Sequence, residues 1–270
     1  MLQDADRTRI LAISPHLDDA VLSVGASLAQ AARDGGKVTV FTVFAGSAAP
    51  PYSPAAERFH ARWGLSPTED APLRRRNEDI AALDHLGADH RHGRFPDAIY
   101  RKSPDGQWLL HHDGGSAVRQ QSPVNNHDLA SAIRHDIESV IAECEPTLLL
   151  TCVAIGNHPD HMVTRDATLL TAGGRGIPLR LWQDLPYAVY SSNMAELPSG
   201  LQLGSPDLSF VQEEARARKF QAMKHYATQL SVLDGPNKNL FARLEEHARS
   251  ASPDGGYNET TWPVIRHADQ

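Results

Sequence analysis

Two short clusters of histidine and aspartate carry the residue types needed for metal-dependent chemistry. The first lies at His16–Asp19 and the second, far downstream, at Asn157–His161. Zinc in catalytic sites commonly takes three protein ligands of the imidazole and carboxylate type and leaves one position for water. His16, Asp19 and His161 can fill these three places, so the two clusters together predict one hydrolytic metal site.

The other polar residues of the clusters can supply the steps of a hydrolysis. Asp18 lies between two predicted ligands but projects differently, so it can take the proton of a water whose pKa a metal ion lowers toward ~7. His158 can donate a hydrogen bond to an oxyanion or a proton to a leaving amine, and Asp160 can orient an imidazole. Taken alone, the paired aspartates could be helix N-caps and the histidines exposed loop residues. Their joint occurrence favours the metal site.

Each cluster follows an apolar run that is typical of a buried parallel strand, at residues 9–14 and 147–153. A helical pattern over 19–34 ends at a Gly-Gly pair, and a second strand is expected at 37–45. These elements form a βαβ unit, which implies a right-handed crossover and a parallel sheet. The polar clusters therefore lie at the carboxyl ends of strands, where open α/β sheets bind ligands.

The rest of the chain favours a single α/β domain over residues 1–270. Two stretches, 46–72 and 101–126, show no period and are expected to be loops that shape the rim of the site. The further elements that we expect are helices at 73–86, 127–143, 161–172 (closed by Gly173-Gly174), 211–233 and 240–247, and strands at 88–95 and 179–182. The basic run Arg74–Arg76 opens one of these helices against its dipole. It either serves an anionic or polar group or is simply solvated.

Composition narrows the choice of partners. The formal charge of −7 argues against binding to a nucleic-acid backbone, and no apolar run approaches the ~20 residues of a membrane span. The polar start leads straight into a strand, so a cytoplasmic protein is the expectation. Cys144 and Cys152 are predicted to be buried thiols rather than a disulfide. Most of the 14 histidines are expected at the surface, for example His111, His112, His127, His135 and His247.

The two clusters also resemble the motifs of a known family. Pro15-His16-Leu17-Asp18-Asp19 resembles the Pro-His-x-Asp-Asp motif of the PIG-L/LmbE-like zinc N-deacetylases, and His158-Pro159-Asp160-His161 resembles their second motif. Weaker similarities to family positions lie at Arg75–Asp79, Asp97, Leu185–Tyr187, Lys219, Ala222, Tyr226 and Gln229.

The resemblance implies a Rossmann-like fold with a mostly parallel sheet, helices on both faces and the active site at the carboxyl ends of the strands. It implies Zn(II) bound by His16, Asp19 and His161, Asp18 as general base and His158 as electrophilic or acid partner. Arg75 and Asp97 would bind the substrate, a small N-acetylated amino sugar or its conjugate. Leu17 and Ala20 depart from the usual family residues; this leaves the ligands intact and the substrate subgroup open.

Two alternatives remain at the level of sequence. One is an amidase that cleaves a thiol–sugar conjugate of the mycothiol or bacillithiol type. The other is a non-catalytic sugar- or nucleotide-binding α/β module, although the first strand is not followed by a glycine-rich phosphate loop. Sites of this ligand type also accept iron or cobalt. The oligomeric state stays open, and a homo-oligomer is one option.

Overall fold

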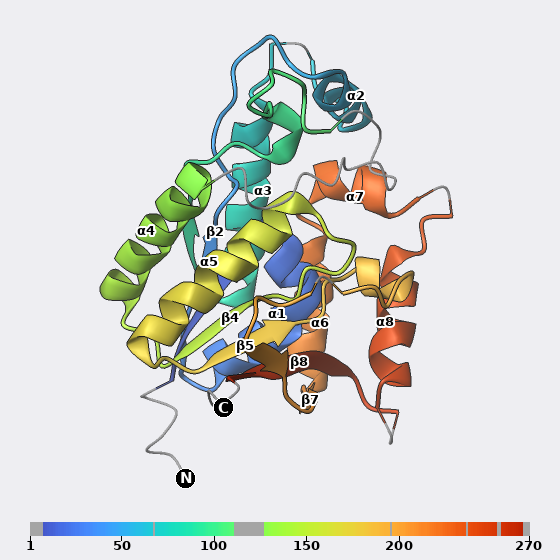
Figure 1. The fold of residues 1–270 in the computed structure, drawn as a ribbon. Coiled ribbons are helices and arrows are strands. Elements are labelled where there is room, and N and C mark those ends of the chain that lie inside the picture. The colour runs from blue at the N-terminus through green and yellow to red at the C-terminus, as the bar shows by residue number, and fades with distance from the viewer. Residues whose placement is uncertain are drawn as a thin grey trace.

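A computed structural model of the chain describes residues 8–66, 68–110, 127–194, 196–235, 237–252 and 255–266. Its centre is an eight-stranded sheet in the order β3-β2-β1-β4-β5-β8-β6, with β7 also paired to β8 (Figure 1). The strands are β1 (Arg9–Ser14), β2 (Lys37–Thr42), β3 (Asp89–His92), β4 (Leu148–Cys152), β5 (Leu179–Trp182), β6 (Leu201–Leu203), β7 (Asp207–Phe210) and β8 (Asn258–Arg266). The helices are α1 (Asp19–Arg33), α2 (Pro54–Arg62), α3 (Ala71–Leu86), α4 (His127–Cys144), α5 (Pro159–Arg175), α6 (Glu213–Met223), α7 (Ala227–Leu233) and α8 (Leu240–Ser250), with short 3-10 turns at Ala98–Tyr100 and Tyr187–Val189.

The two sequence clusters come together because β1 and β4 are neighbours. β1 pairs in parallel with β2 on one side and with β4 on the other. From β1 the chain runs outward through β2 to β3, then returns to build β4 and β5 on the opposite side. This reversal is a topological switch point, and open α/β sheets bind their ligands beyond the carboxyl ends of the strands at such a point. The expected Rossmann-like, mostly parallel sheet is confirmed.

Helices cover both faces of the sheet (Figure 1). Neighbouring residues of β1 point to opposite faces: Leu11 and Ile13 join the core under α4 and α5, whereas Ala12 joins the core under α1 and α3. On α4, residues Ile133 and Ile137 lie one helical turn apart and are fully buried against this first core. Burying one such side chain contributes about 1.5–3 kcal/mol, so both helical layers are fixed to the sheet by apolar packing.

One of the two expected loops contains a helix. Within 46–72, Ser53 caps α2 by accepting a hydrogen bond from Ala56 N at 2.9 Å, and Pro54 occupies the first turn. Both features are standard helix starts, but the short helix has few apolar residues to give it a period. The other expected loop, 101–126, is described only as far as residue 110.

The predicted helix over 211–233 is wrong as a single element, because the chain leaves helical geometry at Tyr226 (ψ 58°) and divides into α6 and α7. The Glu78 carboxylate accepts hydrogen bonds from the backbone N–H and the hydroxyl of Thr228, which gives α7 its own N-terminal partner. Gly173-Gly174 also fails to close α5, which runs on until Gly176 adopts a left-handed conformation (φ 64°).

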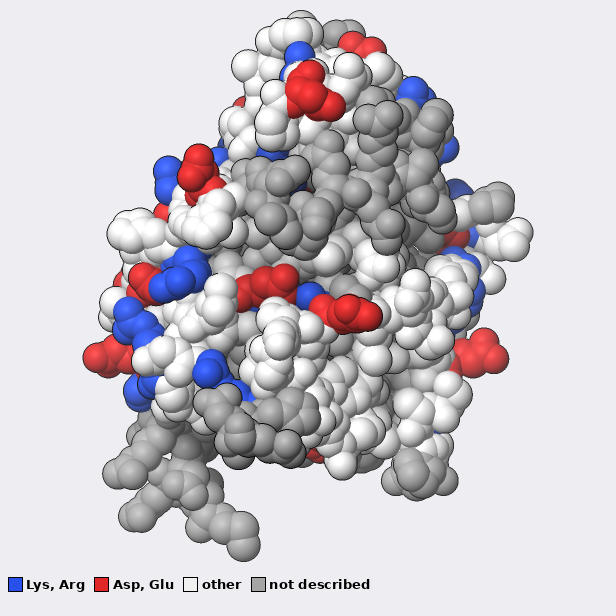
Figure 2. All heavy atoms as spheres, in the orientation of Figure 1, with Lys and Arg blue, Asp and Glu red and all other residues white. Residues whose placement is uncertain are grey.

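The antiparallel part of the sheet was not expected from the sequence. β8 pairs antiparallel with β5, β6 and β7 and completes the sheet beyond β5. β2 and β3 lie where expected but are shorter than predicted. No helix in the described part of the chain is long and apolar enough to cross a membrane. On the face drawn in Figure 2, Lys and Arg lie interspersed with Asp and Glu.

The two cysteines, Cys144 and Cys152, are buried free thiols, as predicted. Of the histidines expected at the surface, His127 and His135 are exposed and His247 is half-buried. His111 and His112 lie outside the described residues.

Candidate metal centre

The first cluster lies in the turn between β1 and α1. The Ser14 hydroxyl donates to the carbonyl of His16 at 2.8 Å and accepts from Ala20 N at 3.2 Å, which ties the strand end to the helix start. The His16 N–H donates to Asp19 Oδ2 at 2.9 Å. Between them, Asp18 adopts φ 152° and ψ −30°, a conformation that L-residues rarely take. Such strained backbone is concentrated at functional sites.

The second cluster forms the first turn of α5, which begins at Pro159 rather than at the predicted residue 161. His158 caps this helix, because its Nδ1 accepts a hydrogen bond from Asp160 N at 3.2 Å. The proton of a neutral His158 ring must therefore be on Nε2. The cap fixes the ring and leaves Nε2–H as a donor.

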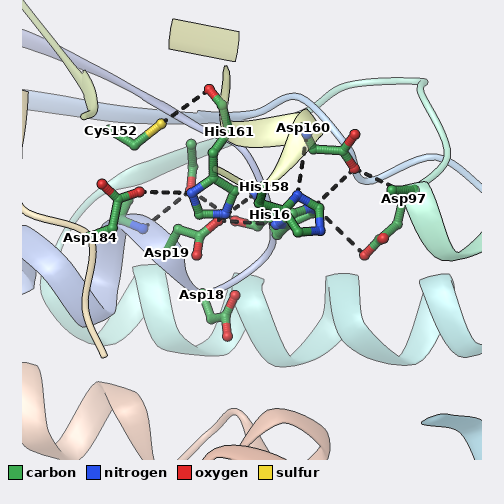
Figure 3. A network of polar contacts seen from close by, with 12 residues as sticks. His16, Asp18, Asp19, Asp97, Cys152, His158, Asp160, His161 and Asp184 are labelled. Atoms are coloured by element: carbon green, nitrogen blue, oxygen red, sulfur yellow. Dashed lines mark hydrogen bonds and ion pairs between the residues drawn. The ribbon is translucent and has the colours of Figure 1, made fainter. Parts of the chain in front are cut away.

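The three predicted ligands converge on one point. His16 Nδ1 lies 3.3 Å and His161 Nε2 lies 3.2 Å from the same oxygen, Asp19 Oδ2 (Figure 3). Two ligands that bind one zinc ion tetrahedrally at about 2.0–2.1 Å are themselves about 3.4 Å apart. The spacing of each histidine from Asp19 is therefore that of atoms able to share one zinc ion.

The outer nitrogen of each ligand histidine contacts a carboxylate. His16 Nε2 donates to Asp160 Oδ2 at 3.1 Å, and His161 Nδ1 lies 2.7 Å from Asp184 Oδ1. Within the described residues, His161 Nε2 is buried and has no hydrogen-bond partner. An orphaned, buried ring nitrogen that faces a carboxylate is the atom a zinc ion would use, so the residues fit this metal.

The electrostatics of the cluster also favour a cation. Although burial acts in the opposite direction, Asp97 and Asp160 raise the pKa of His16 to about 10. Burial likewise opposes ionisation of Asp19, yet His161 and His16 hold the pKa of that carboxyl well below its usual range. The shift of His16 reports the negative charge of the surrounding carboxylates, which a divalent cation would offset. The shift of Asp19 shows that its neighbours favour the ionised carboxylate, the form that can bind a metal.

Asp18 and His158 differ from the ligands in their protonation. Burial, followed by the neighbouring charge of Asp19, raises the pKa of Asp18 to about 8. Burial lowers the pKa of His158 to about 4. Asp18 can therefore gain and lose a proton near neutral pH, while His158 stays a neutral hydrogen-bond donor.

Arg75 and Asp97, the predicted substrate-binding residues, lie together beside the ligands. Arg75 Nη1 donates to Asp97 Oδ2 at 3.3 Å, and its Nη2 lies 4.0 Å from Asp18 Oδ1. The guanidinium also lies over the ring of Trp63, 5.2 Å from its centroid. Of the two alternatives for the arginine run, the solvated one is wrong for Arg75, which is buried, and applies to Arg74, which is exposed.

Sequence reasoning missed two residues of this network. Asp184 contacts His161, and Arg101 pairs with Asp160. A signal for Asp184 existed, since it follows the predicted strand at 179–182 and so lies at the same sheet edge as the clusters. Arg101 had none, because nothing in the stretch 101–126 has a motif.

Among the described residues, three sets of possible ligand atoms lie within 4.8 Å of one another, and none of them contains Asp19. They are His16 with His158 and His161, His16 with Asp97 and Asp160, and Cys152 with His161 and Asp184. In the second, the carboxylates already pair with Arg75 and Arg101. In the third, the Cys152 thiol donates to the His161 carbonyl, and burial raises the thiol pKa to about 11. The set around Asp19 rests instead on the distances of His16 Nδ1 and His161 Nε2 from Asp19 Oδ2.

Comparison with known proteins agrees with this geometry. The family model described as PIG-L, GlcNAc-PI de-N-acetylase, matches residues 11–172, which include both clusters. A 2'-N-acetylparomamine deacetylase from Streptomyces fradiae is 31% identical over 196 residues, covering 69% of this chain and 63% of that protein. The chain thus spans somewhat less than two thirds of that relative.

Two solved structures are similar over nearly the whole chain. One is that of Dbv21, a deacetylase of the A40926 pseudoaglycone, which is 79% identical with a TM-score of 0.86 and covers 98% of this chain and 100% of its own. The other is the zinc-inhibited form of the teicoplanin deacetylase Orf2, which is 59% identical with a TM-score of 0.92 and covers 97% of this chain and 100% of its own.

Proposed function

The chain belongs to the PIG-L family, and on that premise we propose that it is a zinc-dependent deacetylase that hydrolyses the acetamide of an N-acetylated amino sugar. The observation that carries the proposal is the convergence of His16 Nδ1 and His161 Nε2 on Asp19 Oδ2, at 3.3 and 3.2 Å. His16, Asp19 and His161 would hold the metal. When bound there, zinc polarises a carbonyl and lowers the pKa of water.

Asp18 acts as the general base. Its carboxylate takes a proton from the attacking water and, once protonated, can pass that proton to the nitrogen of the leaving amine. A pKa raised to about 8 by burial and by Asp19 suits both steps, because the group changes its protonation near neutral pH. Arg75 Nη2, 4.0 Å from Asp18 Oδ1, favours the charged form of the carboxylate and holds it in place.

His158 stabilises the oxyanion that forms when water adds to the acetyl carbonyl. Its Nδ1 accepts from Asp160 N, so its Nε2–H is free to donate to that oxygen. Because burial lowers its pKa to about 4, the ring donates as a neutral imidazole. A fixed donor aimed at a developing negative charge contributes more in a buried site than in water.

Arg75 and Asp97 bind the hydroxyl groups of the sugar. Arg75 lies near the N-terminus of α3, and Asp97 caps the 3-10 turn Ala98–Tyr100. Because the two side chains contact each other, they present hydrogen-bond donors and acceptors side by side. The aromatic rings of Tyr52, His60 and Tyr100 contact one another nearby, and His60 Nε2 lies 2.7 Å from Tyr100 Oη. They provide a half-buried wall for the remainder of the substrate.

The substrate class follows the relatives that match the full chain. Since those proteins deacetylate the A40926 pseudoaglycone and teicoplanin, we expect the N-acetylated sugar to be attached to a large pseudoaglycone of this kind. The test is to incubate the zinc-loaded protein with the A40926 pseudoaglycone, teicoplanin and 2'-N-acetylparomamine and to follow acetate release and product mass. Loss of one acetyl group from a pseudoaglycone is expected. Folded, zinc-loaded protein that releases acetate from none of them would contradict the proposal.

A further inference from the structure

A single buried carboxylate, Asp184, is in contact with the parts of the chain that hold the metal ligands. It follows β5 and is 1% exposed. Its Oδ1 lies 2.7 Å from His161 Nδ1. Its Oδ2 accepts two backbone hydrogen bonds, from Val153 N and Ile155 N, at 3.1 Å each. One side chain thus joins the end of β4 to the imidazole that the second cluster contributes.

Resting on the proposed metal centre, we propose that Asp184 is a positioning residue that keeps a proton on His161 Nδ1 and so reserves Nε2 for the metal. A carboxylate can only accept from the ring nitrogen that faces it. The hydrogen bond to one nitrogen of an imidazole decides which nitrogen is left to bind a metal. In this structure the nitrogen left over is the one that has no hydrogen-bond partner among the described residues.

The other ligand histidine has the same arrangement with the nitrogens exchanged. His16 donates through Nε2 to Asp160 and faces Asp19 through Nδ1. Each ligand histidine therefore has its own carboxylate on the outer side, and both inner nitrogens face Asp19 Oδ2 (Figure 3). Asp160 belongs to the second sequence cluster, whereas Asp184 follows β5 and lies outside both clusters.

The segment that carries Asp184 is also tied to the helix that carries Asp19. The next residue, Leu185, donates its N–H to the buried hydroxyl of Ser23 at 3.1 Å, and Ser23 lies one turn along α1 from Asp19. The position of Asp184 is consequently fixed relative to the ligands on both β1–α1 and α5.

The isosteric change Asp184→Asn gives a sharp test, because the two backbone donors constrain the amide. The amide oxygen must face Val153 N and Ile155 N, since the NH₂ group would meet two N–H donors there. The NH₂ group then faces His161 Nδ1 and donates to it, which moves the ring proton to Nε2 and blocks the ligand atom. A substitution that changes almost no volume should therefore weaken metal binding.

Asp79→Asn is the matched control. Asp79 is also buried and also contacts an imidazole, with Oδ2 2.8 Å from His92 Nε2, and its Oδ1 accepts from the Tyr226 hydroxyl at 2.7 Å. His92 is not a predicted ligand. Both substitutions remove one buried charge and one carboxylate–imidazole hydrogen bond, so both can lower the unfolding temperature of the metal-free protein. Only Asp184→Asn should alter zinc affinity.

Zinc affinity is measured by competition with a chromophoric chelator. We expect about a 10- to 100-fold weaker Kd in Asp184→Asn, the loss typical of a partner behind a metal ligand, and a Kd for Asp79→Asn within about threefold of the unchanged protein. Equal Kd values for Asp184→Asn and the unchanged protein, or an equal loss in both variants, would overturn the proposal. An unchanged protein that binds no zinc would instead contradict the metal centre itself.

A second measurement needs no variant and applies even if Asp184→Asn fails to fold. Nitrogen-15 NMR of the histidine rings in the zinc-loaded protein should show His161 protonated at Nδ1 and bound to zinc through Nε2. Zinc at Nδ1 with a proton on Nε2 would overturn the proposal and would place the ion among Cys152, His161 and Asp184.

Discussion

Two groups of buried charges in this molecule are built in opposite ways. Lys219 and Glu259 form a buried pair, 2.6 Å apart, in which every carboxylate oxygen has a donor. α1 departs from helical geometry at Val24 (φ −130°), and Glu259 accepts from the backbone N–H groups of the next turn, Ala26 and Ser27. This pair takes the place of a helix cap inside the core.

In the cluster at the strand ends, formed by His16, Asp18, Asp19, His158 and His161, not every polar atom has a partner within the described part of the chain. His161 Nε2 has no hydrogen-bond partner among the described residues, Asp18 has a strained backbone, and burial raises the pKa of Asp18 to about 8. Unmet polar groups of this kind cost stability and are kept where a ligand or a reaction uses them. The contrast is the one expected if the pair serves the fold and the cluster, as proposed, serves a metal and a substrate. Variants of the cluster should therefore lose zinc binding or turnover, whereas variants of the pair should lose stability alone.

The largest effect is expected from removing a ligand. His161→Ala should weaken zinc binding by well over the roughly 100-fold that loss of an outer partner can cost, and deacetylation should cease. Because the change also leaves a cavity at a fully buried position and removes the imidazole partner of Asp184 Oδ1, the metal-free protein should unfold at a lower temperature than before. Zinc content after dialysis and a thermal melt check this. A His161→Ala protein that retains stoichiometric zinc would contradict the assignment of His161 as a metal ligand.

Asp18→Asn should separate binding of the metal from turnover. Removing a general base typically costs about 10²–10⁴-fold in rate, whereas the three ligands stay in place. Steady-state kinetics and the zinc Kd are measured on the same preparation. Turnover near that of the unchanged protein would show that Asp18 is not the base.

Lys219→Met should have the opposite effect, a loss of stability without a loss of zinc binding. It leaves Glu259 as an unpaired buried charge, which costs about 3–5 kcal/mol of unfolding free energy, while zinc affinity is unchanged. Chemical denaturation gives the first quantity and chelator competition the second. Adding Glu259→Gln should recover part of the loss, because no buried charge then remains. Weakened zinc binding in a folded Lys219→Met protein would remove the distinction between the two groups.

The same pair makes a prediction about alkaline pH. Although burial alone would lower it, Glu259 raises the pKa of Lys219 above the ordinary lysine value in the folded state. The stabilisation is therefore complete below the unfolded pKa and is lost as the pH rises through the folded one. Unfolding free energy measured above pH 10 should fall more steeply for the unchanged protein than for the double variant Lys219→Met/Glu259→Gln, in which neither group titrates. Equal slopes would contradict the pairing.

The smallest effect is expected at the edge of the cluster. Trp63 covers the guanidinium of Arg75, and a partly exposed cation–π contact contributes about 0.5–1 kcal/mol. Trp63→Ala should therefore raise KM for a pseudoaglycone by about two- to fivefold, with zinc affinity and kcat retained. Trp63→Phe, which keeps an aromatic ring, should return KM most of the way to that of the unchanged protein. A kcat effect larger than the KM effect would place Trp63 inside the reacting centre.

The parallel half of the fold was predictable because its signals are local. An apolar strand, a polar turn and an amphipathic helix follow one another within residues 9–42, and β1 and β4 each end in a cluster. The antiparallel strands were not, since β8 contains a polar stretch and a proline and is defined by pairing with β5, β6 and β7. α2 was missed because its start is marked by Ser53 and Pro54 rather than by an apolar period.

The candidate site likewise contains residues that local sequence signals predict and residues that they do not. The proposed ligands His16, Asp19 and His161 stand in two compact motifs, so their types and spacing indicate the chemistry. Asp184 contributes through one hydrogen bond formed in the folded chain, and Arg101 through its ion pair with Asp160. Contacts of this kind depend on how distant strands end beside one another, which the sequence pattern does not specify.

The most direct measurement is the location of the bound ion by anomalous diffraction at the zinc edge in crystals of the zinc-loaded protein. We expect one ion within about 2.0–2.2 Å of His16 Nδ1, Asp19 Oδ2 and His161 Nε2. An ion held instead by His16 Nε2 with Asp97 and Asp160, or no ion between the two clusters, would contradict a metal centre at the switch point of the sheet.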